Sequence, residues 1–214
     1  VASYGEVVAG LPASLFEAEI TRVTQGQDER LLDFSQLRQL TRSFLALYEP
    51  HAGRPFPQDA QEQLSGAIAA VFASWNADKA AEYRRINQID ADMGTAVILQ
   101  RMVFGNTGGH SGAGVGFTRD PSTGEPRLWV DFLANAQGED VVSGRRNAHG
   151  HATLAAVAPD AWKQLQASAQ ALEQHFQDME DFEFTVQDGV LHMLQTRSGK
   201  RTPLAAARIA IDLL

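Results

Sequence analysis

The sequence predicts an α+β protein in which helices come first and antiparallel strands follow. Apolar residues recur at helical spacing up to about residue 86. After Met93-Gly94 the pattern changes to β-branched and apolar runs bounded by glycine and proline. An Asp188-Gly189 pair between two such runs is typical of a hairpin. With 214 residues, the chain is long enough for two compact lobes.

Helices are expected in four places before residue 95. The first follows residues 11–14, and the second begins at a cap formed by Asp33 or Ser35. Three prolines and a glycine within 50–57 interrupt the helical pattern and mark a first boundary. A third helix begins after a cap formed by Asp59, and a further helical stretch follows near 79–86.

Strands are expected from residue 95 onward. The run 95–104 is apolar and β-branched, and we predict that it forms a buried strand. Six glycines within 105–116 indicate an irregular segment, followed by strands at 115–118 and 127–133. The remaining elements are expected in this order: a loop over 135–150, a helix capped near Asp160, a hairpin over 181–197, and a helix from Thr202-Pro203.

Composition excludes several functional classes. A net charge of -8, without any run of Lys and Arg, argues against nucleic acid as a partner. The absence of Cys excludes disulfides and thiol nucleophiles and fits a reducing, cytoplasmic location. No stretch approaches the roughly 18 apolar residues that a membrane span needs, so no membrane partner is expected. The abrupt start at Val1, without a signal-peptide pattern, is interpreted as a fragment of a larger protein.

The hairpin at 181–197 admits two registers. A two-residue Asp188-Gly189 turn would put Glu183 and Gln195 on opposite faces. A three-residue loop, with Gly189 in a bulge, would gather four polar side chains on one face, and the apolar alternation favours this register. These side chains are Asp181, Glu183, Gln195 and Arg197. There the carboxylates could hold Mg²⁺ beside a phosphate-binding guanidinium, although a solvated face with an ion pair is the alternative.

Three loop features carry weaker signals. The glycine-rich run 105–114 is either a plain loop or a phosphate cradle, and it lacks the Gly-Lys-Ser/Thr of the Walker pattern. The segment 135–144 offers Glu139 and Asp140, and it is either a surface loop or a ligand-binding one. His149 and His151 could bind a metal, but no third ligand has matching spacing, so a simple loop is favoured.

Long blocks of this sequence resemble the pyruvate phosphate dikinase family. The blocks are 94–97, 100–106, 111–125, 132–144, 173–184 and 194–202. The resemblance also covers 56–87 and weakens before residue 50. It implies an ATP-grasp nucleotide-binding domain, in which ATP lies between two α+β lobes. We therefore expect a helical subdomain over 1–56, part of the first ATP-grasp lobe over 57–103, and the second lobe with a C-terminal helix over 104–214.

The resemblance also implies roles for individual residues. The backbone around Gln100, Met102 and Val103 would form a hinge on the adenine side, and Glu139 would contact the nucleotide.

In the hairpin, the resemblance assigns Asp181 and Glu183 to Mg²⁺ and the phosphates, and it assigns Gln195 and Arg197 to the phosphate chain. Glu183 and Arg197 are the expected catalytic residues, whose task is alignment and charge neutralisation rather than covalent chemistry.

The family reaction interconverts ATP, phosphate and pyruvate with AMP, pyrophosphate and phosphoenolpyruvate. The other domains of the enzyme would be a swivelling phosphohistidine domain and a pyruvate-binding barrel. A homo-oligomer would form through domains outside this chain. The chain also lacks the family's phosphate-binding glycine-rich segment with its Lys and the later Arg, so we expect it to be catalytically incomplete. Asp131 stands where the family usually has Glu, and 145–158 departs from the family sequence.

Two rival interpretations accompany this one. A related dikinase, similar to phosphoenolpyruvate synthase or to antibiotic-phosphorylating enzymes, would use the same domain. A stand-alone, non-catalytic module would bind nucleotide or protein. The block Asn135-Ala136-Gln137-Gly138-Glu139-Asp140-Val141-Val142 favours pyruvate phosphate dikinase.

Overall fold

The structure is a computed structural model that describes residues 1–26, 32–142 and 149–214. It places the backbone, but not the side chains, of Glu139, Val142 and His149. The chain divides into two compact units, 1–99 and 100–214, and each is described by itself. The domain boundaries predicted after residues 56 and 103 remain predictions.

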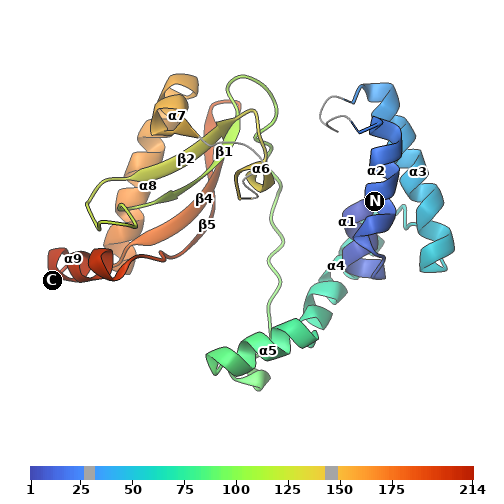
Figure 1. Cartoon of the computed structure of the whole chain (residues 1–214), viewed down its shortest axis with the longest axis horizontal. Helices are drawn as coiled ribbons and strands as arrows, with labels where there is room; N and C mark the ends of the chain where they lie inside the picture. Colours follow the sequence, from blue (N-terminus) through green and yellow to red (C-terminus); the bar gives the residue numbers. More distant parts are fainter. Residues whose placement is uncertain (27–31, 143–148) are drawn as a thin grey trace. The chain divides into compact units, whose positions relative to one another are not determined.

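The first unit is helical (Figure 1). Its helices are α1 (Ala2–Ala9), α2 (Ala13–Thr24), α3 (Phe34–Ala52), α4 (Ala60–Ser74) and α5 (Asp78–Asn87), followed by a 3₁₀ turn at Ala91–Met93. The four predicted helices are confirmed, whereas α1 was not predicted. Helix α3 runs through Pro50 and ends at Gly53, which has a positive φ of 69°, so the interruption begins slightly later than expected.

Polar caps and aromatic packing explain these helices. Asp33 and Gln36 form a reciprocal capping box at the start of α3, and Asp59 accepts a hydrogen bond from the backbone N–H of Glu62. Phe16 and Tyr48 are buried in a small core between the helices. The Tyr48 ring meets Phe56 edge to face at 5.2 Å between centroids.

The buried strand predicted over 95–104 is wrong. The structure assigns no strand to these residues, and Ile98, Leu99 and Met102 are exposed. A β-branched sequence favours an extended backbone, but a strand also needs a neighbour for its hydrogen bonds. The described strands begin at Gly112 and pair with one another, so they leave this run without a partner strand in the described chain.

The second unit combines a sheet with helices, which confirms the α+β class. Its strands are β1 (Gly112–Phe117), β2 (Trp129–Ala134), β3 (His149–Gly150), β4 (Glu180–Gln187) and β5 (Val190–Ser198). In the described residues they form one antiparallel sheet in the order β3-β2-β1-β4-β5 (Figure 1). Its helices are α6 (Gly138–Val142), α7 (His151–Val157), α8 (Pro159–Phe176) and α9 (Pro203–Asp212).

Helices α7 and α8 cover one face of this sheet. Phe182, Phe184 and Val186 alternate along β4 and are buried there against Leu154 and Leu165. The opposite face therefore carries the polar residues of β4.

Three details of this unit differ from the sequence prediction. Strand β1 begins at Gly112, inside the run expected to be irregular, because its glycines leave room for aromatic rings. The expected loop over 135–150 contains the short helix α6. Helix α8 begins at Pro159 with Ala158 as its cap, so Asp160 lies in the first turn instead of capping.

Polar contacts fix the start of helix α9. Thr202 caps it by accepting from the backbone N–H of Ala205, as predicted. The Arg201 guanidinium pairs with the Asp178 carboxylate, with Nη2 to Oδ2 at 2.7 Å, and this pairing lowers the pKa of Asp178. No helix in the described ranges is long and apolar enough to cross a membrane.

Arg119 provides a test of how α8 and α9 are held. Its side chain is 6% exposed and bonds Glu173 and Asp212, and the Glu173 hydrogen bond raises the pKa of Arg119. We expect Arg119→Met to destabilise the second unit by about 2–3 kcal/mol, because Glu173 would stay partly buried without its partner. Urea denaturation measures this. Arg127→Met is the control, because the Arg127 side chain is 72% exposed. Equal effects of the two changes would contradict the prediction.

Candidate functional site

The β4–β5 hairpin combines both predicted registers. Its turn has two residues, Asp188 and Gly189, with positive φ of 52° and 81°, and Gln187 pairs with Val190. The favoured three-residue loop is therefore wrong. Between Glu183 and Phe184 the register shifts by one residue, since Phe184 faces Met193 and Glu183 faces Gln195. Leu194 is the extra residue of a β-bulge.

The bulge restores the arrangement that the favoured register predicted. Glu183 is directly opposite Gln195, and Asp181 is directly opposite Arg197. Directly opposed residues share a face, so these four side chains lie together on the face away from α7 and α8. The sequence was right about the grouping and wrong about the turn that produces it.

The four residues differ in exposure and in partners. Arg197 Nε donates to Asp181 Oδ2 at 2.8 Å, and this hydrogen bond raises the pKa of Arg197. The Asp181 side chain is 11% exposed and that of Arg197 is 61% exposed. Glu183 is half-buried and Gln195 is exposed. The arginine is thus oriented by a buried carboxylate while its other nitrogens remain open to a phosphate.

The neighbouring strands extend this polar face. Asp131 on β2 and Val115 on β1 lie in the same cross-sheet row as Glu183 and Gln195. Val115 separates the two carboxylates, so Asp131 is about 10 Å from Glu183, or two strand spacings. Asp131 therefore lies near the hairpin residues but is not adjacent to them.

The acidic residues could contribute to a Mg²⁺ site but could not complete one. The described residues contain no group of three or more His, Asp or Glu side chains arranged to hold a metal ion. Asp181 and Glu183 are two residues apart on one strand, about 7 Å along it. Mg²⁺ commonly takes one or two carboxylates and fills its remaining positions with water and phosphate oxygens. These oxygen donors fit that chemistry.

The predicted hinge residues line a groove with the hairpin. Gln100, Met102 and Val103 face Val190–Leu194 across a cavity of about 790 Å³. In the described structure no hydrogen bond involves the backbone of 100–103. Its amide and carbonyl groups are therefore available to a ligand in this groove.

The glycine-rich run connects this groove to the end of the sheet. The buried Ser111 hydroxyl accepts from the backbone N–H of Asp188, and the N–H of Gly108 donates to the Asn135 side chain at 3.2 Å. Both hydrogen bonds fix the run to neighbouring loops. These contacts connect the run to the rest of the unit, and both interpretations of its sequence, a plain loop and a phosphate cradle, stay predictions.

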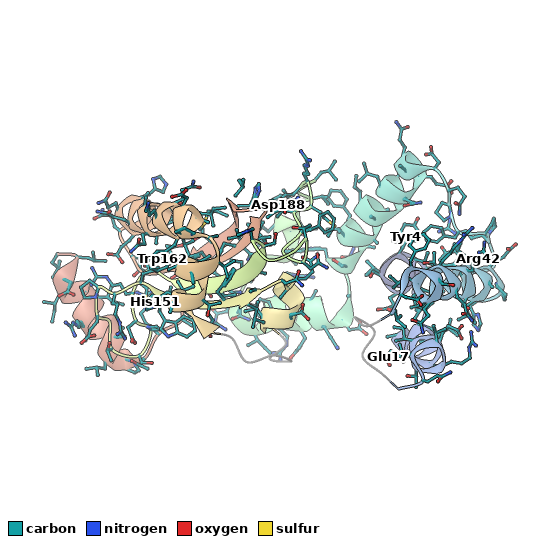
Figure 2. All side chains as sticks on the ribbon, turned by 90° about the horizontal axis from the view of Figure 1, so that it is seen from above. Tyr4, Glu17, Arg42, His151, Trp162 and Asp188 are labelled. Carbon is teal, nitrogen blue, oxygen red and sulfur yellow. The ribbon has the colours of Figure 1, made fainter. Side chains whose placement is uncertain are left out.

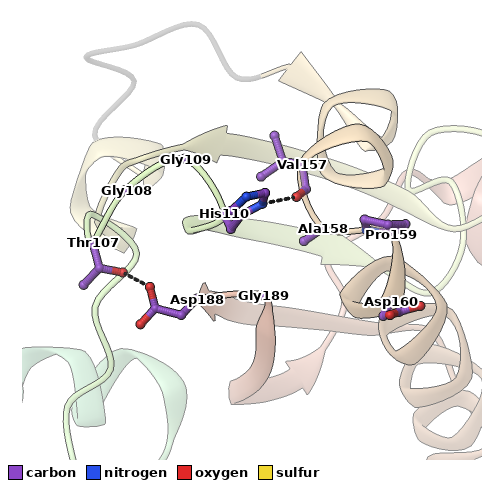
Figure 3. Close-up of a pocket in the computed structure, with 10 residues that line it drawn as sticks. All are labelled: Thr107, Gly108, Gly109, His110, Val157, Ala158, Pro159, Asp160, Asp188 and Gly189. Carbon is purple, nitrogen blue, oxygen red and sulfur yellow. Dashed lines mark hydrogen bonds between the residues drawn. The ribbon is translucent and has the colours of Figure 1, made fainter.

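A second cavity, of about 430 Å³, lies beside that run (Figure 3). It is bounded by the run, the β4–β5 turn and the start of α8. His110 Nδ1 lies 3.1 Å from the carbonyl oxygen of Val157, and Thr107 donates to Asp188 (Figure 3). These polar side chains are thus engaged within the protein.

Two other predicted features fall partly outside the described structure. The Glu139 backbone lies in α6, but its side chain is not described, so its predicted nucleotide contact remains a prediction. The segment 145–158 is described from residue 149 onward. There the His151 ring stacks on Trp162 at 5.4 Å between centroids (Figure 2), which is a packing role.

Sequence reasoning did not identify two amide side chains beside the hinge. Gln187 Oε1 accepts from the backbone N–H of Phe104 at 2.8 Å, and Gln137 Oε1 accepts from that of Gly105 at 3.4 Å. These contacts join residues 83 and 32 positions apart, so no local pattern marks them.

Comparisons with known proteins agree on one family. The sequence model of the family described as "Pyruvate phosphate dikinase, AMP/ATP-binding domain" matches residues 21–155. The chain is 47% identical to the pyruvate, phosphate dikinase of Clostridium symbiosum over 215 residues, covering 99% of this chain and 25% of that protein. It is 47% identical to the chloroplastic enzyme of Mesembryanthemum crystallinum, and 45% identical to pyruvate, phosphate dikinase 1 of Arabidopsis thaliana. The chain spans 23% and 22% of these two plant relatives, and 99% of it is covered in each comparison.

Proposed function

This chain belongs to the pyruvate phosphate dikinase AMP/ATP-binding domain family, and we propose that it supplies much of the MgATP site of a pyruvate phosphate dikinase-like phosphotransferase. The observation that carries the proposal is the shared face of Asp181, Glu183, Gln195 and Arg197. An acidic pair beside an oriented guanidinium suits a metal-bound triphosphate.

In the proposed reaction, ATP, phosphate and pyruvate are interconverted with AMP, pyrophosphate and phosphoenolpyruvate. The relatives compared above are pyruvate, phosphate dikinases, which supports this enzyme over the related dikinases. A phosphohistidine domain and a pyruvate-binding barrel would act with this chain, and domains of that kind would also form any oligomer. The cytoplasm remains the proposed location for this chain, although the plant relatives are named chloroplastic.

Each residue has a distinct task in this proposal. Arg197, held by Asp181, presents its free nitrogens to the phosphate chain, and the Gln195 amide donates to it. Glu183 and Asp181 offer oxygens to Mg²⁺, which when bound neutralises charge on the phosphates. The backbone at Met102 and Val103 binds the base, and Glu139 contacts the nucleotide. This is catalysis by positioning and electrostatics.

The reading frame that contains this chain provides a direct test. A phosphohistidine domain and a barrel encoded after it would support the dikinase. A natural start and stop at the two ends would support the rival module that binds nucleotide or protein without catalysis.

We expect the 214-residue chain alone to bind MgATP weakly. The lysine of the family's glycine-rich segment and the arginine that follows it are not among the residues of this chain. Each such charged contact contributes about 1.5–3 kcal/mol to binding. Two lost contacts would weaken binding by about 100-fold or more relative to the full-length enzyme. Isothermal titration calorimetry with MgATP measures this difference. Equal affinity of the two proteins would show that the missing contacts are dispensable.

A further inference from the structure

The hinge segment is fixed to the sheet at one end. Phe104 N–H donates to Gln187 Oε1 at 2.8 Å, and Gly105 N–H donates to Gln137 Oε1 at 3.4 Å. The carbonyl oxygen of Gly105 also accepts from the backbone N–H of Ala136 at 3.0 Å. The hydrogen bonds that hold this segment in the described structure therefore begin directly after Val103.

Gly105 makes this attachment rigid. It is buried, and a Cβ built on it would lie 2.7 Å from the backbone of Gly112 and would overlap the carbonyl oxygen of Ala136. The backbone at Gly105 thus packs directly against the backbone of Gly112 and Ala136, and only glycine fits there. The position of Met102 and Val103 depends on the contact one residue earlier, at Phe104.

Gln187 is well placed to control that contact. It is the last residue of β4 and pairs with Val190 of β5, so its backbone is held by the sheet. Alternation along β4 puts it on the same face as Asp181 and Glu183. Glu183 is four residues away, about 13 Å along the strand. An extended nucleoside triphosphate covers a comparable length, with its base at one end and its phosphates at the other.

We propose that Gln187 is a positioning residue for base recognition, whose side-chain oxygen sets the placement of the backbone groups of 100–103 in the groove. This inference rests on the proposed MgATP function and adds a specificity determinant to it. Gln187 also lines the groove, but the role assigned to it is to hold Phe104 and not to contact the base. It acts through the N–H of Phe104, and the free amide and carbonyl groups before Phe104 contact the ligand.

The chemistry of the bases makes this role measurable. Adenine presents an amino donor where guanine presents a carbonyl acceptor. Backbone amide and carbonyl groups at fixed positions can pair with the hydrogen-bonding groups of adenine. Against guanine, some of these groups stay unpaired, and the cost of leaving them unpaired discriminates between the two bases. A hinge released at Phe104 loses this fixed spacing. Contacts to the triphosphate, made by the other end of β4 and by β5, are unchanged.

The test compares Gln187→Leu, Gln187→Glu and the wild type in the full-length enzyme. Gln187→Leu removes the acceptor at similar volume, and we expect the KM for ATP to rise about 3- to 10-fold, as for one lost hydrogen bond. The preference for ATP over GTP, as a ratio of kcat/KM, should fall by a similar factor, with kcat within about twofold. Gln187→Glu keeps an acceptor oxygen, so its KM for ATP and its preference for ATP over GTP should match those of the wild type.

The control is Gln164→Leu, the same chemical change at an exposed position of α8, and it should leave KM and the preference unchanged. If Gln187→Leu fails to fold, Gln187→Asn serves instead, because it shortens the reach by one methylene and should raise the KM. An unchanged KM and ATP preference in the folded variants would overturn the inference. A wild-type enzyme without ATP-dependent activity would instead overturn the proposed function.

Discussion

Glu183→Ala and Arg197→Ala, each made in the full-length enzyme, are expected to lower kcat/KM for ATP by about 100-fold or more. Fixed charges directed at a phosphoryl group contribute on the order of 3 kcal/mol or more each to the transition state. The Arg197 side chain is 61% exposed, so Arg197→Ala should still fold, although it lowers stability because the 11%-exposed Asp181 side chain loses its partner. Steady-state kinetics measure the loss, and circular dichroism checks the fold.

Lys163→Ala is the matched control for Arg197→Ala. Lys163 forms an exposed ion pair with Asp160 on α8, away from the polar face. Its removal deletes a cation of the same charge and should leave kcat/KM unchanged. If both site variants turned over at the wild-type rate, the assignment of these residues to the phosphates would be wrong.

Gly114→Val should destabilise the second unit by about 3 kcal/mol or more. A Cβ at Gly114 would overlap the ring of Phe184 and lie 2.7 Å from the carbonyl oxygen of Asp131. A ring can rotate away, but the carbonyl belongs to β2 and pairs within the sheet. Urea denaturation followed by circular dichroism measures the change.

Gly109→Ala separates this steric effect from the general effect of replacing glycine. A Cβ at Gly109 meets nothing within 4 Å, and its φ is not positive. Its substitution should change stability by less than about 0.5 kcal/mol. Equal destabilisation by both changes would mean that β1 does not need its glycines for packing.

Local signals in the sequence predicted much of the fold. Asp33, Asp59 and Thr202 cap helices because their side chains bond backbone groups three residues on, which is visible in sequence. Alternation along β4 separated Phe182 and Phe184 from Asp181 and Glu183. These interactions depend on near neighbours, so no tertiary information was needed.

The sequence predictions failed where contacts between residues far apart in the sequence determine the structure. The run 95–104 has strand propensity, but pairing depends on a neighbour that the described sheet does not provide. In the hairpin, the Asp188-Gly189 turn and the apolar alternation each favoured a different register. A bulge at Leu194 satisfies both, and neither signal alone could show it. The contact of Gln187 with Phe104 likewise depends on the tertiary fold.

The bulge at Leu194 also relates the length of strand β5 to the length of the hairpin turn. The two-residue turn leaves one residue of β5 without an opposite partner, and the bulge at Leu194 accommodates it. At the same hairpin length, a three-residue turn would place Glu183 opposite Gln195 through a regular strand, with Leu194 opposite Phe184. A homologue with a three-residue turn and a hairpin of this length is therefore expected to have no bulge there.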